Sequence, residues 1–559
     1  MCHVWGSRMK KLLLFTMLVL GFQFGFNAHA VVDMKNANFS NSWVDLEVPG
    51  TGYDLKIART YNSKSLFDGL FGYGWCSDFE TTLSFTAEGN IKLTECGAGQ
   101  EMFFTPREFG RKDIDKTISQ IIAKVKATKH VDETTLKKLA TDMVNDNDLR
   151  AKFAFSYKVA IPIRDGSRFY ANGREVENIQ FSKGVYTRYL TDGSYMRFNA
   201  EGRMTYMYDK NSNYLKIDWD KDTIREIVDN NGRRLNFKYY NNKKVKSIAA
   251  PGGLNLEYKY ANLDDLSSAK NAWNNTYTYT YDDTHNMTKA TYPDKTFIEL
   301  TYDKKNDWVT SFKDRENCLE NYKYEFSDKN PKMHYWSLVK KTCGKDVVNE
   351  SKHEFWYQQR SDGQTYLSRV ASTVNGNVTD ITYHEVFGKP VAIRRNSERY
   401  TFTYYANGEV KDKNGDFVRL NYSYDKASGK VAEVIATTKN QKGKVIATRK
   451  TQFKYDGKGN LTFASNSDGQ KVNMTYDNRG RIASITDQAK KVVKIQYEDR
   501  FGKPSIVTRP GLGTIQVSYK SNGEIDKVNS AEGPTVAMQV ASTFNNLLDV
   551  ISPATAEIF

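Results

Sequence analysis

A tyrosine followed by an acidic residue returns at a fixed interval in this sequence, and this repeat is the strongest constraint on how the chain can fold. A strict internal period lets a chain of 559 residues build one continuous array, where length alone would suggest several domains. Within residues 455–504 the interval is 21 residues, and the pairs are Tyr455-Asp456, Tyr476-Asp477 and Tyr497-Glu498.

Each repeat carries two turn signals. Asp477 and Gly480 are the first and fourth residues of Asp-Asn-Arg-Gly, and these are the residue preferences of a type I turn. The carboxylate accepts backbone N–H groups, and glycine lets the chain leave with positive φ. A second turn, Asn-Ser-Asp-Gly-Gln at 466–470, lies half a period earlier. Two turns per repeat leave two strands of about six residues, which predicts one up-and-down step of an antiparallel meander.

The side chains of the predicted strands alternate between apolar and polar. Tyr277, Tyr279 and Tyr281, for example, are separated by two threonines. This period of two with one polar face predicts a half-buried antiparallel sheet. A ligand box is the alternative interpretation of the tyrosines, but 35 of them are too many for one site. Because a tyrosine buries its ring and keeps its hydroxyl near water, we expect the repeat tyrosines to line the interior of the wound sheet: Tyr239, Tyr260, Tyr281, Tyr302, Tyr383, Tyr404, Tyr455, Tyr476 and Tyr497.

The repeat is interrupted twice. Its register is lost between Tyr302 and Tyr383, and from Tyr424 to Tyr455 the step lengthens to 31 residues around Thr-Thr-Lys-Asn-Gln-Lys-Gly-Lys. We expect longer hairpins there that project from one rim of the array. Projections from repeat arrays are often the places where binding occurs.

The first 30 residues have the pattern of a secretory signal peptide. A basic Met-Lys-Lys precedes an apolar run, and Ala28-His29-Ala30 supplies small residues at a cleavage site. A membrane anchor is the alternative, but the run from Leu12 to Phe26 is shorter than the roughly 20 residues that a spanning helix needs. No later segment is long and apolar enough to span a membrane as a helix. We therefore expect a periplasmic, cell-surface or secreted protein.

The charge of the chain is moderately basic. Removal of residues 1–30 lowers the formal net charge from +15 to +12, an excess that would favour anionic polymers such as lipopolysaccharide or wall polymers. An ordinary solvated surface explains the same excess, and no dense Lys/Arg tract argues otherwise. We expect no specific binding to nucleic acid.

Export would permit disulfides among the cysteines that remain, which are Cys76, Cys96, Cys318 and Cys343. The last two flank two aromatic-rich strand candidates with a turn at 330–331 midway between them, so a hairpin brings them opposite each other. The first two flank a hairpin candidate whose turn, at 87–90, is off-centre, so their pairing is geometrically less favoured. No Cys-x-x-Cys or Cys/His cluster indicates a metal site.

Between Arg107 and Arg150 the strand period gives way to apolar residues at helical spacing. This predicts an inserted helical hairpin with helices at 113–127 and 132–145, and the same spacing predicts a third helix at 535–551. Large exposed apolar surfaces are rare in soluble proteins. We therefore expect at least one of these helices to pack on the apolar face of the sheet.

The repeats and the head segment LKIARTYNSKSLFDGLFGYGWCSDF at 55–79 together resemble the Rhs/YD-repeat family, over about residues 38–530. The resemblance implies a meander wound as a spiral sheet into a shell, which in long members encloses a toxic C-terminal domain. The Asp-Pro-x-Gly-Leu element that closes the family's core is absent here. The nearest string is TRPGLG at 508–513, and 26 residues follow Gly533, too few for such a domain.

The predicted fold is all-β: a repetitive antiparallel YD-repeat meander wound into an open or partial spiral β-shell, with an inserted helical hairpin and a C-terminal helix. The expected segments are a signal peptide (1–30), an N-terminal β module (31–106), a helical insertion (107–152), the repeat shell (153–530) and a C-terminal helix and tail (531–559).

No catalytic, cofactor or metal motif accompanies this fold. The histidines are scattered without His-Glu-x-x-His, and neither Gly-x-Ser-x-Gly nor a phosphate-binding glycine loop occurs. We predict an exported, non-enzymatic scaffold or binding protein without a cofactor, with a carbohydrate or wall polymer as ligand. The alternative is a shell-like component of a toxin or secretion system that shelters a separately encoded polypeptide as protein cargo.

Overall fold

The computed structural model describes most of the chain between Val31 and Ser530. It omits residues 51, 87–88, 96–99, 107–110, 130, 146, 158, 160–162, 172–173, 263, 361–364 and 521–522, and beyond Ser530 it describes Met538, Val540, Ser542 and Val550. The expected signal peptide therefore lies outside the described residues, as does most of the expected helix at 535–551.

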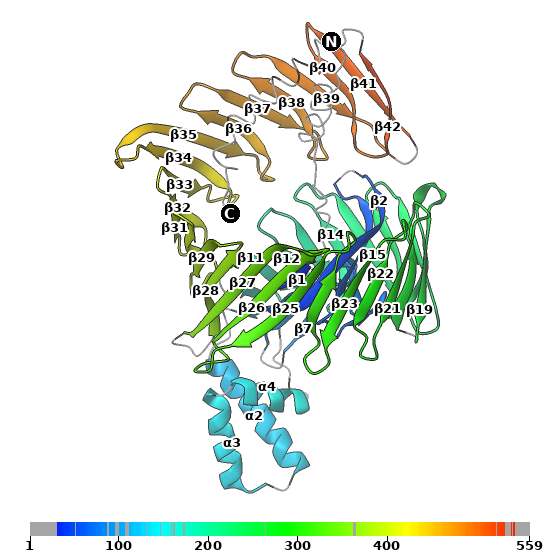
Figure 1. Cartoon of the computed structure of the whole chain (residues 1–559), viewed down its shortest axis with the longest axis vertical. Helices are drawn as coiled ribbons and strands as arrows, with labels where there is room; N and C mark the ends of the chain where they lie inside the picture. The colour runs from blue at the N-terminus through cyan, green and yellow to red at the C-terminus, as the bar shows by residue number, and fades with distance from the viewer. Residues whose placement is uncertain are drawn as a thin grey trace.

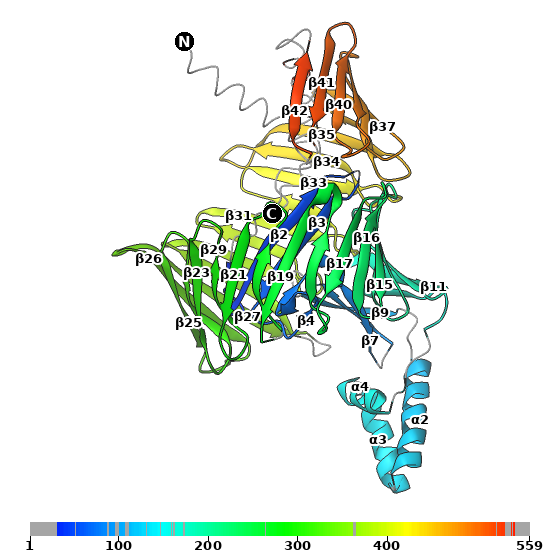
Figure 2. The same ribbon diagram turned by 90° about the vertical axis from the view of Figure 1, so that its right-hand side faces the viewer.

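One long antiparallel sheet winds as an open spiral through the described chain (Figures 1 and 2). Each of its strands pairs with the next one along the chain, which is the predicted meander, and β9 pairs with β10 across the helical insertion. We call the strands up to β29 the first wind and the later strands the second wind.

The strands of the first wind are β7 (Thr82–Phe85), β8 (Ile91–Glu95), β9 (Gln100–Pro106), β10 (Arg168–Ala171), β11 (Arg174–Ser182), β12 (Val185–Tyr189), β13 (Tyr195–Phe198), β14 (Met204–Tyr208), β15 (Tyr214–Asp220), β16 (Thr223–Asp229), β17 (Arg234–Tyr239), β18 (Val245–Ala249), β19 (Asn255–Ala261), β20 (Asp265–Lys270), β21 (Thr276–Tyr281), β22 (Met287–Thr291), β23 (Phe297–Asp303), β24 (Trp308–Lys313), β25 (Leu319–Phe326), β26 (His334–Cys343), β27 (Asp346–Gln359), β28 (Thr365–Val374) and β29 (Asn377–Tyr383).

The strands of the second wind are β30 (Pro390–Arg395), β31 (Glu398–Tyr404), β32 (Val410–Asn414), β33 (Val418–Tyr424), β34 (Val431–Lys439), β35 (Val445–Tyr455), β36 (Leu461–Asn466), β37 (Lys471–Tyr476), β38 (Ile482–Asp487), β39 (Val492–Tyr497), β40 (Pro504–Arg509), β41 (Gly513–Tyr519) and β42 (Ile525–Ser530).

A smaller sheet from the start of the chain lies inside the first wind. It orders β1 (Val31–Asp33), β2 (Asn38–Val48), β3 (Leu55–Asn62) and β6 (Trp75–Cys76), and a short hairpin of β4 (Asp68–Gly69) and β5 (Gly72–Tyr73) precedes β6. Its apolar residues belong to one buried cluster with the first wind. The blue strands in Figures 1 and 2 lie accordingly against the inner face of the green ones.

The acid of each repeat holds its turn closed, as the turn chemistry predicts. Asp477 Oδ1 accepts the backbone N–H groups of Arg479 (3.0 Å) and Arg481 (2.9 Å). Gly480 has φ = 79°, a conformation that side chains other than glycine rarely adopt. A Cβ at this glycine would also lie only 2.0 Å from the side chain of Asn211 in the first wind. Glycine is therefore needed here for the turn and for the approach of the two winds.

The two winds meet along these turns. Asn460 Nδ2 donates to Asn211 Oδ1 at 3.0 Å, and Lys210 Nζ donates to the Gly459 carbonyl at 3.3 Å. From the same turn of the first wind, Asn213 Nδ2 donates to the Arg479 carbonyl at 3.0 Å, one repeat further along the second wind. These contacts join residues about 250 positions apart, so roughly that length of chain completes one revolution.

The helical insertion differs from its prediction. It contains three helices, α2 (Arg111–Thr128), α3 (Glu133–Asn145) and α4 (Asn147–Ser156), and is therefore not a two-helix hairpin ending at residue 152. Ile118, Ile121, Leu136, Met143 and neighbouring apolar residues bury one another in a separate cluster. Figures 1 and 2 show the three helices projecting from the sheet. They do not cover its apolar face, because they bury their apolar stripes against each other. Among the described residues, no helix is long and apolar enough to cross a membrane.

Candidate functional site

The interior of the first wind is filled by the chain's own N-terminal sheet and is not a binding cavity. At its centre Arg59 forms an ion pair with Asp45, with Nη2 to Oδ1 at 3.0 Å, and neither side chain is exposed. The Tyr258 hydroxyl donates to Asp45 Oδ2 at 2.8 Å, and the guanidinium lies 4.8 Å from the centre of the Trp75 ring. Burial, and then the nearby carboxylate of Asp45, raise the pKa of Tyr258 well above its ordinary value.

This buried pair was missed by sequence reasoning, although a signal was present. In Leu55-Lys-Ile-Ala-Arg59-Thr-Tyr61 the arginine occupies the register of the apolar residues. A charged residue in that register predicts a buried partner, since unpaired buried charges are strongly unfavourable. The pair anchors the N-terminal sheet to the repeat sheet and is too enclosed to meet a substrate.

A second buried acid, Glu80, is hydrogen-bonded to the backbone of the N-terminal segment. Glu80 Oε1 accepts the Leu70 N–H at 2.6 Å, and Oε2 accepts the Ser77 N–H at 2.8 Å. Burial raises the pKa of Glu80 to about 7, although these hydrogen bonds and nearby Lys244 act in the opposite direction. A raised carboxyl pKa in an enzyme would suggest a general acid, but Glu80 is only 4% exposed and its carboxylate accepts backbone N–H groups.

The apolar face of the second wind holds residues from the C-terminal segment of the chain. The buried residues Val540 (2% exposed) and Val550 (0%), from beyond the sheet, belong to its apolar cluster. The expectation that a C-terminal helix covers apolar sheet surface therefore holds for two of its four described residues, Val540 and Val550, whereas Met538 and Ser542 are exposed. We define the second-wind face by its buried members Phe402, Leu420, Tyr422, Val434, Phe453, Val472, Met474, Ile485, Val493 and Ile495.

Two hydroxyl groups on the second-wind face lack a partner. Tyr422 pairs across the sheet with Val434, which pairs with Thr451, so these three side chains share one row. Tyr422 is 3% exposed and Thr451 is 0% exposed, and neither hydroxyl has a hydrogen-bond partner among the described residues. Most buried polar groups in proteins are hydrogen-bonded, so within the described residues this row holds two unsatisfied hydroxyl groups.

The repeat tyrosines form a row of clamps between neighbouring hairpins. The Tyr281 hydroxyl donates to the Leu266 carbonyl at 2.8 Å, 15 residues earlier on the adjacent strand, and Tyr476 donates likewise to Leu461 at 2.7 Å. Burial raises the pKa of Tyr476 to about 12, with Asp456 adding to the shift. Tyr383 is half-buried where β29 meets Pro390. The others, which pack against the two apolar clusters of the sheet and make the same kind of bond, are Tyr239, Tyr260, Tyr302, Tyr404, Tyr455 and Tyr497.

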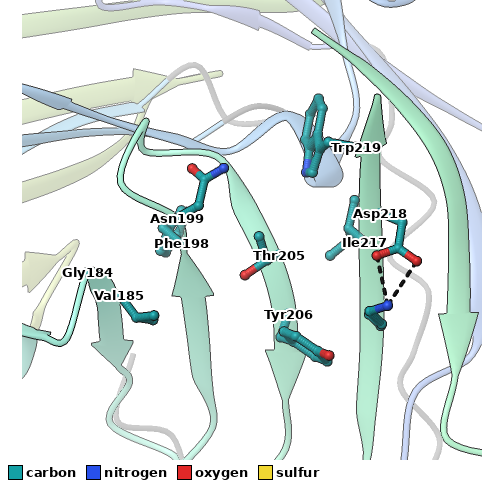
Figure 3. Close-up of a pocket in the computed structure, with 10 residues that line it drawn as sticks. Gly184, Val185, Phe198, Asn199, Thr205, Tyr206, Ile217, Asp218 and Trp219 are labelled. Carbon is teal, nitrogen blue, oxygen red and sulfur yellow. Dashed lines mark hydrogen bonds and ion pairs between the residues drawn. The ribbon is translucent and has the colours of Figure 1, made fainter. Parts of the chain in front are cut away.

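A shallow cleft of about 430 Å³ lies on strands β12–β15 of the first wind. Figure 3 shows Tyr206 and Trp219 at two sides of it. Lys216, which also lines the cleft, donates from Nζ to Asp218 Oδ2 at 3.0 Å. Beside the cleft, the Tyr195 and Tyr208 rings stack with their centres 4.5 Å apart. The lining of the cleft thus combines two aromatic side chains with a charged pair.

The second cysteine pair behaves as hairpin geometry predicts. Cys318 and Cys343 form a disulfide between the start of the β25 strand region and the end of β26, with Cα atoms 4.3 Å apart. Cys96, the other candidate partner of Cys76, lies outside the described residues. Within the described part of the chain, no three His, Cys, Asp or Glu side chains are grouped as a metal site would require.

Comparison with known proteins gives one family match and several structural ones. Residues 30–104 match a family model described as a domain of unknown function, DUF6531. No curated protein matches. The crystal structure of TcdB2-TccC3-TEV is similar at 10% identity, over 96% of this chain and 29% of that one, with a TM-score of 0.41. The crystal structure of TcdB2-TccC3 without its hypervariable C-terminal region is similar at 10% identity, over 96% of this chain and 29% of that one, with a TM-score of 0.42. The chain thus spans less than a third of the length of these two chains.

Proposed function

We propose that the protein is an exported, non-enzymatic, shell-like scaffold that shelters a polypeptide on its second-wind face. The observation that carries this proposal is the burial of Val540 and Val550 on that face. The interior of the first wind already contains the N-terminal sheet, so the second wind is where a further segment finds apolar surface.

The second-wind face suits a polypeptide for two reasons. Burial of apolar partner surface against its apolar side chains contributes a favourable free energy of about 25 cal/mol per Å². The unpartnered hydroxyls of Tyr422 and Thr451 offer hydrogen bonds that a better-fitting backbone would use. We therefore propose that a separately encoded cargo polypeptide displaces the segment with Val540 and Val550 from this face.

The test uses a synthetic peptide of residues 536–559 and a protein that ends at residue 535. Fluorescence anisotropy should show saturable binding of the labelled peptide, and a peptide with Val540→Asp and Val550→Asp should bind at least about tenfold more weakly, since each valine buries apolar area. In the protein, Val434→Asp on the face should abolish binding, whereas Asn421→Asp on the opposite face of the neighbouring strand should not. Equal binding of both peptides would refute the proposal.

Export is part of the proposal and has its own test. Mass spectrometry of the protein recovered from the periplasm or medium should find Val31 as its first residue. An uncleaved chain confined to the cytoplasm would contradict it.

A polysaccharide ligand is the second candidate, favoured by the cleft with Tyr206 and Trp219 (Figure 3). Aromatic rings stack on the apolar faces of sugar rings. Binding on a glycan array should be lost in Trp219→Ala and kept in Trp273→Ala, a change at an exposed tryptophan outside the cleft. A signal that both variants retain would exclude the cleft as its source.

A further inference from the structure

The hairpin of β34 and β35 extends beyond its neighbours in the second wind. On one side β35 pairs with β36 only from Thr451 onward, so the stretch 445–450 has no paired strand there. Residues 441–448 are all exposed. Figure 1 shows this hairpin, in yellow, projecting from the outline of the wind. The structure thus presents a tip, which we define as residues 439–450 with Phe417 and Val418 beside them.

The tip exposes four apolar side chains, on the strands to either side of Lys439. Ile446 is 63% exposed, Phe417 54%, Val445 51% and Val418 42%. Lys439 lies between Phe417 and Val445, because its N–H donates to the Phe417 carbonyl at 2.7 Å and it is paired with Val445 across the hairpin. Exposed apolar residues are common singly, whereas a group at the end of a projection indicates a contact surface.

The same tip is strongly basic. Between Val434 and Tyr455 the sequence has no acidic residue and six basic ones: Lys439, Lys442, Lys444, Arg449, Lys450 and Lys454. Glu433 and Asp468, at the base of the tip, pair with Lys450 (2.7 Å) and Arg449 (3.0 Å). Lys442 and Lys444 form no salt bridge within the described residues, and Asp416 is the exposed acid nearest Phe417 in sequence.

We propose that this tip docks the protein onto an anionic lipid bilayer. Surface binding to membranes combines burial of apolar side chains at the headgroup boundary with attraction of cations to anionic lipids, and the tip offers both within one hairpin. A soluble polyanion would leave the four apolar side chains exposed. A second copy of the chain would place like charges against each other, and lysines along an unpaired edge oppose strand pairing.

Flotation of the full chain with vesicles tests the inference. We expect binding to phosphatidylglycerol/phosphatidylcholine vesicles that weakens as salt is raised, and no binding to phosphatidylcholine alone. Each cation near such a surface contributes roughly a fivefold gain in affinity, so Lys442→Glu with Lys444→Glu should weaken binding by at least about 25-fold. Ile446→Asp should weaken binding to the same vesicles without removing a cation.

Matched controls come from another exposed hairpin tip. Val348, near the turn between β26 and β27, is 47% exposed, and Lys345 lies in that turn. Val348→Asp and Lys345→Glu make the same kinds of change away from the tip, so both should leave vesicle binding unchanged. Two results would overturn the proposal: equal flotation of tip and control variants, or concentration-dependent dimerisation in light scattering that Ile446→Asp abolishes, which would identify a second copy as the occupant.

Discussion

Two tyrosines of the β33 strand, two residues apart, provide a direct test of what the repeat tyrosine does. The Tyr424 hydroxyl donates to the Val410 carbonyl at 2.9 Å, as in the other clamps. The Tyr422 hydroxyl, on the same face of the same strand, is buried and has no partner among the described residues. Substitution by phenylalanine removes one oxygen atom in either case and keeps the ring.

The two substitutions should change stability in opposite directions. Tyr424→Phe leaves the Val410 carbonyl without its donor, and an unsatisfied buried group costs about 1–3 kcal/mol. Tyr422→Phe removes a buried hydroxyl that makes no hydrogen bond, so it should be neutral or stabilising by up to about 1 kcal/mol. The variants should therefore differ in stability by about 1–4 kcal/mol.

Native-state hydrogen exchange is the suitable assay, because a protein of this length does not unfold in one cooperative step. Amides of β32 and β33 should exchange at least about tenfold faster in Tyr424→Phe than in the parent, and no faster in Tyr422→Phe. Amides of β20 and β21, in the first wind, serve as internal controls. Equal acceleration in both variants would show that ring packing, and not the hydroxyl clamp, accounts for the conserved spacing of tyrosine within this chain's repeats.

Three further predictions follow from other buried groups. Replacing Cys318 and Cys343 by serine should lower stability by about 3 kcal/mol, since the bond closes a loop with a sequence separation of 25; unchanged hydrogen exchange in β25 and β26 would contradict it. Burial raises the pKa of Glu80 from 4.5 to about 7, so the stability that the protonated carboxyl contributes is fully present below pH 4.5 and is lost as the pH rises through 7. Thermal melts of Glu80→Gln should lack this decline in stability, and a pH profile equal to that of the parent would rule the prediction out. Deletion of residues 536–559 should lower the melting temperature and increase binding of a hydrophobic dye, because the second-wind face loses Val540 and Val550; a parent-like melt would mean that these residues add no stability.

The features that could be predicted from the sequence are those that depend on near neighbours along the chain. Asp477 and Gly480 specify a turn through bonds within five residues, and the alternation around Tyr279 specifies which face of its strand is buried. The Cys318–Cys343 bond followed from a turn midway between the two residues. Each of these depends on backbone geometry that one or two strands already define.

Tertiary structure alone decided the contacts between parts that are distant in sequence. The pairing of Arg59 with Asp45 beneath Tyr258 depends on the N-terminal sheet entering the first wind. The meeting of Asn211 with Asn460 depends on twist and curvature summed over every strand between them, which no single repeat encodes. The helices of the insertion bury each other and leave the second-wind face to the segment of Val540. An apolar stripe in the sequence indicates that a surface is buried, but which segment buries it depends on the tertiary structure.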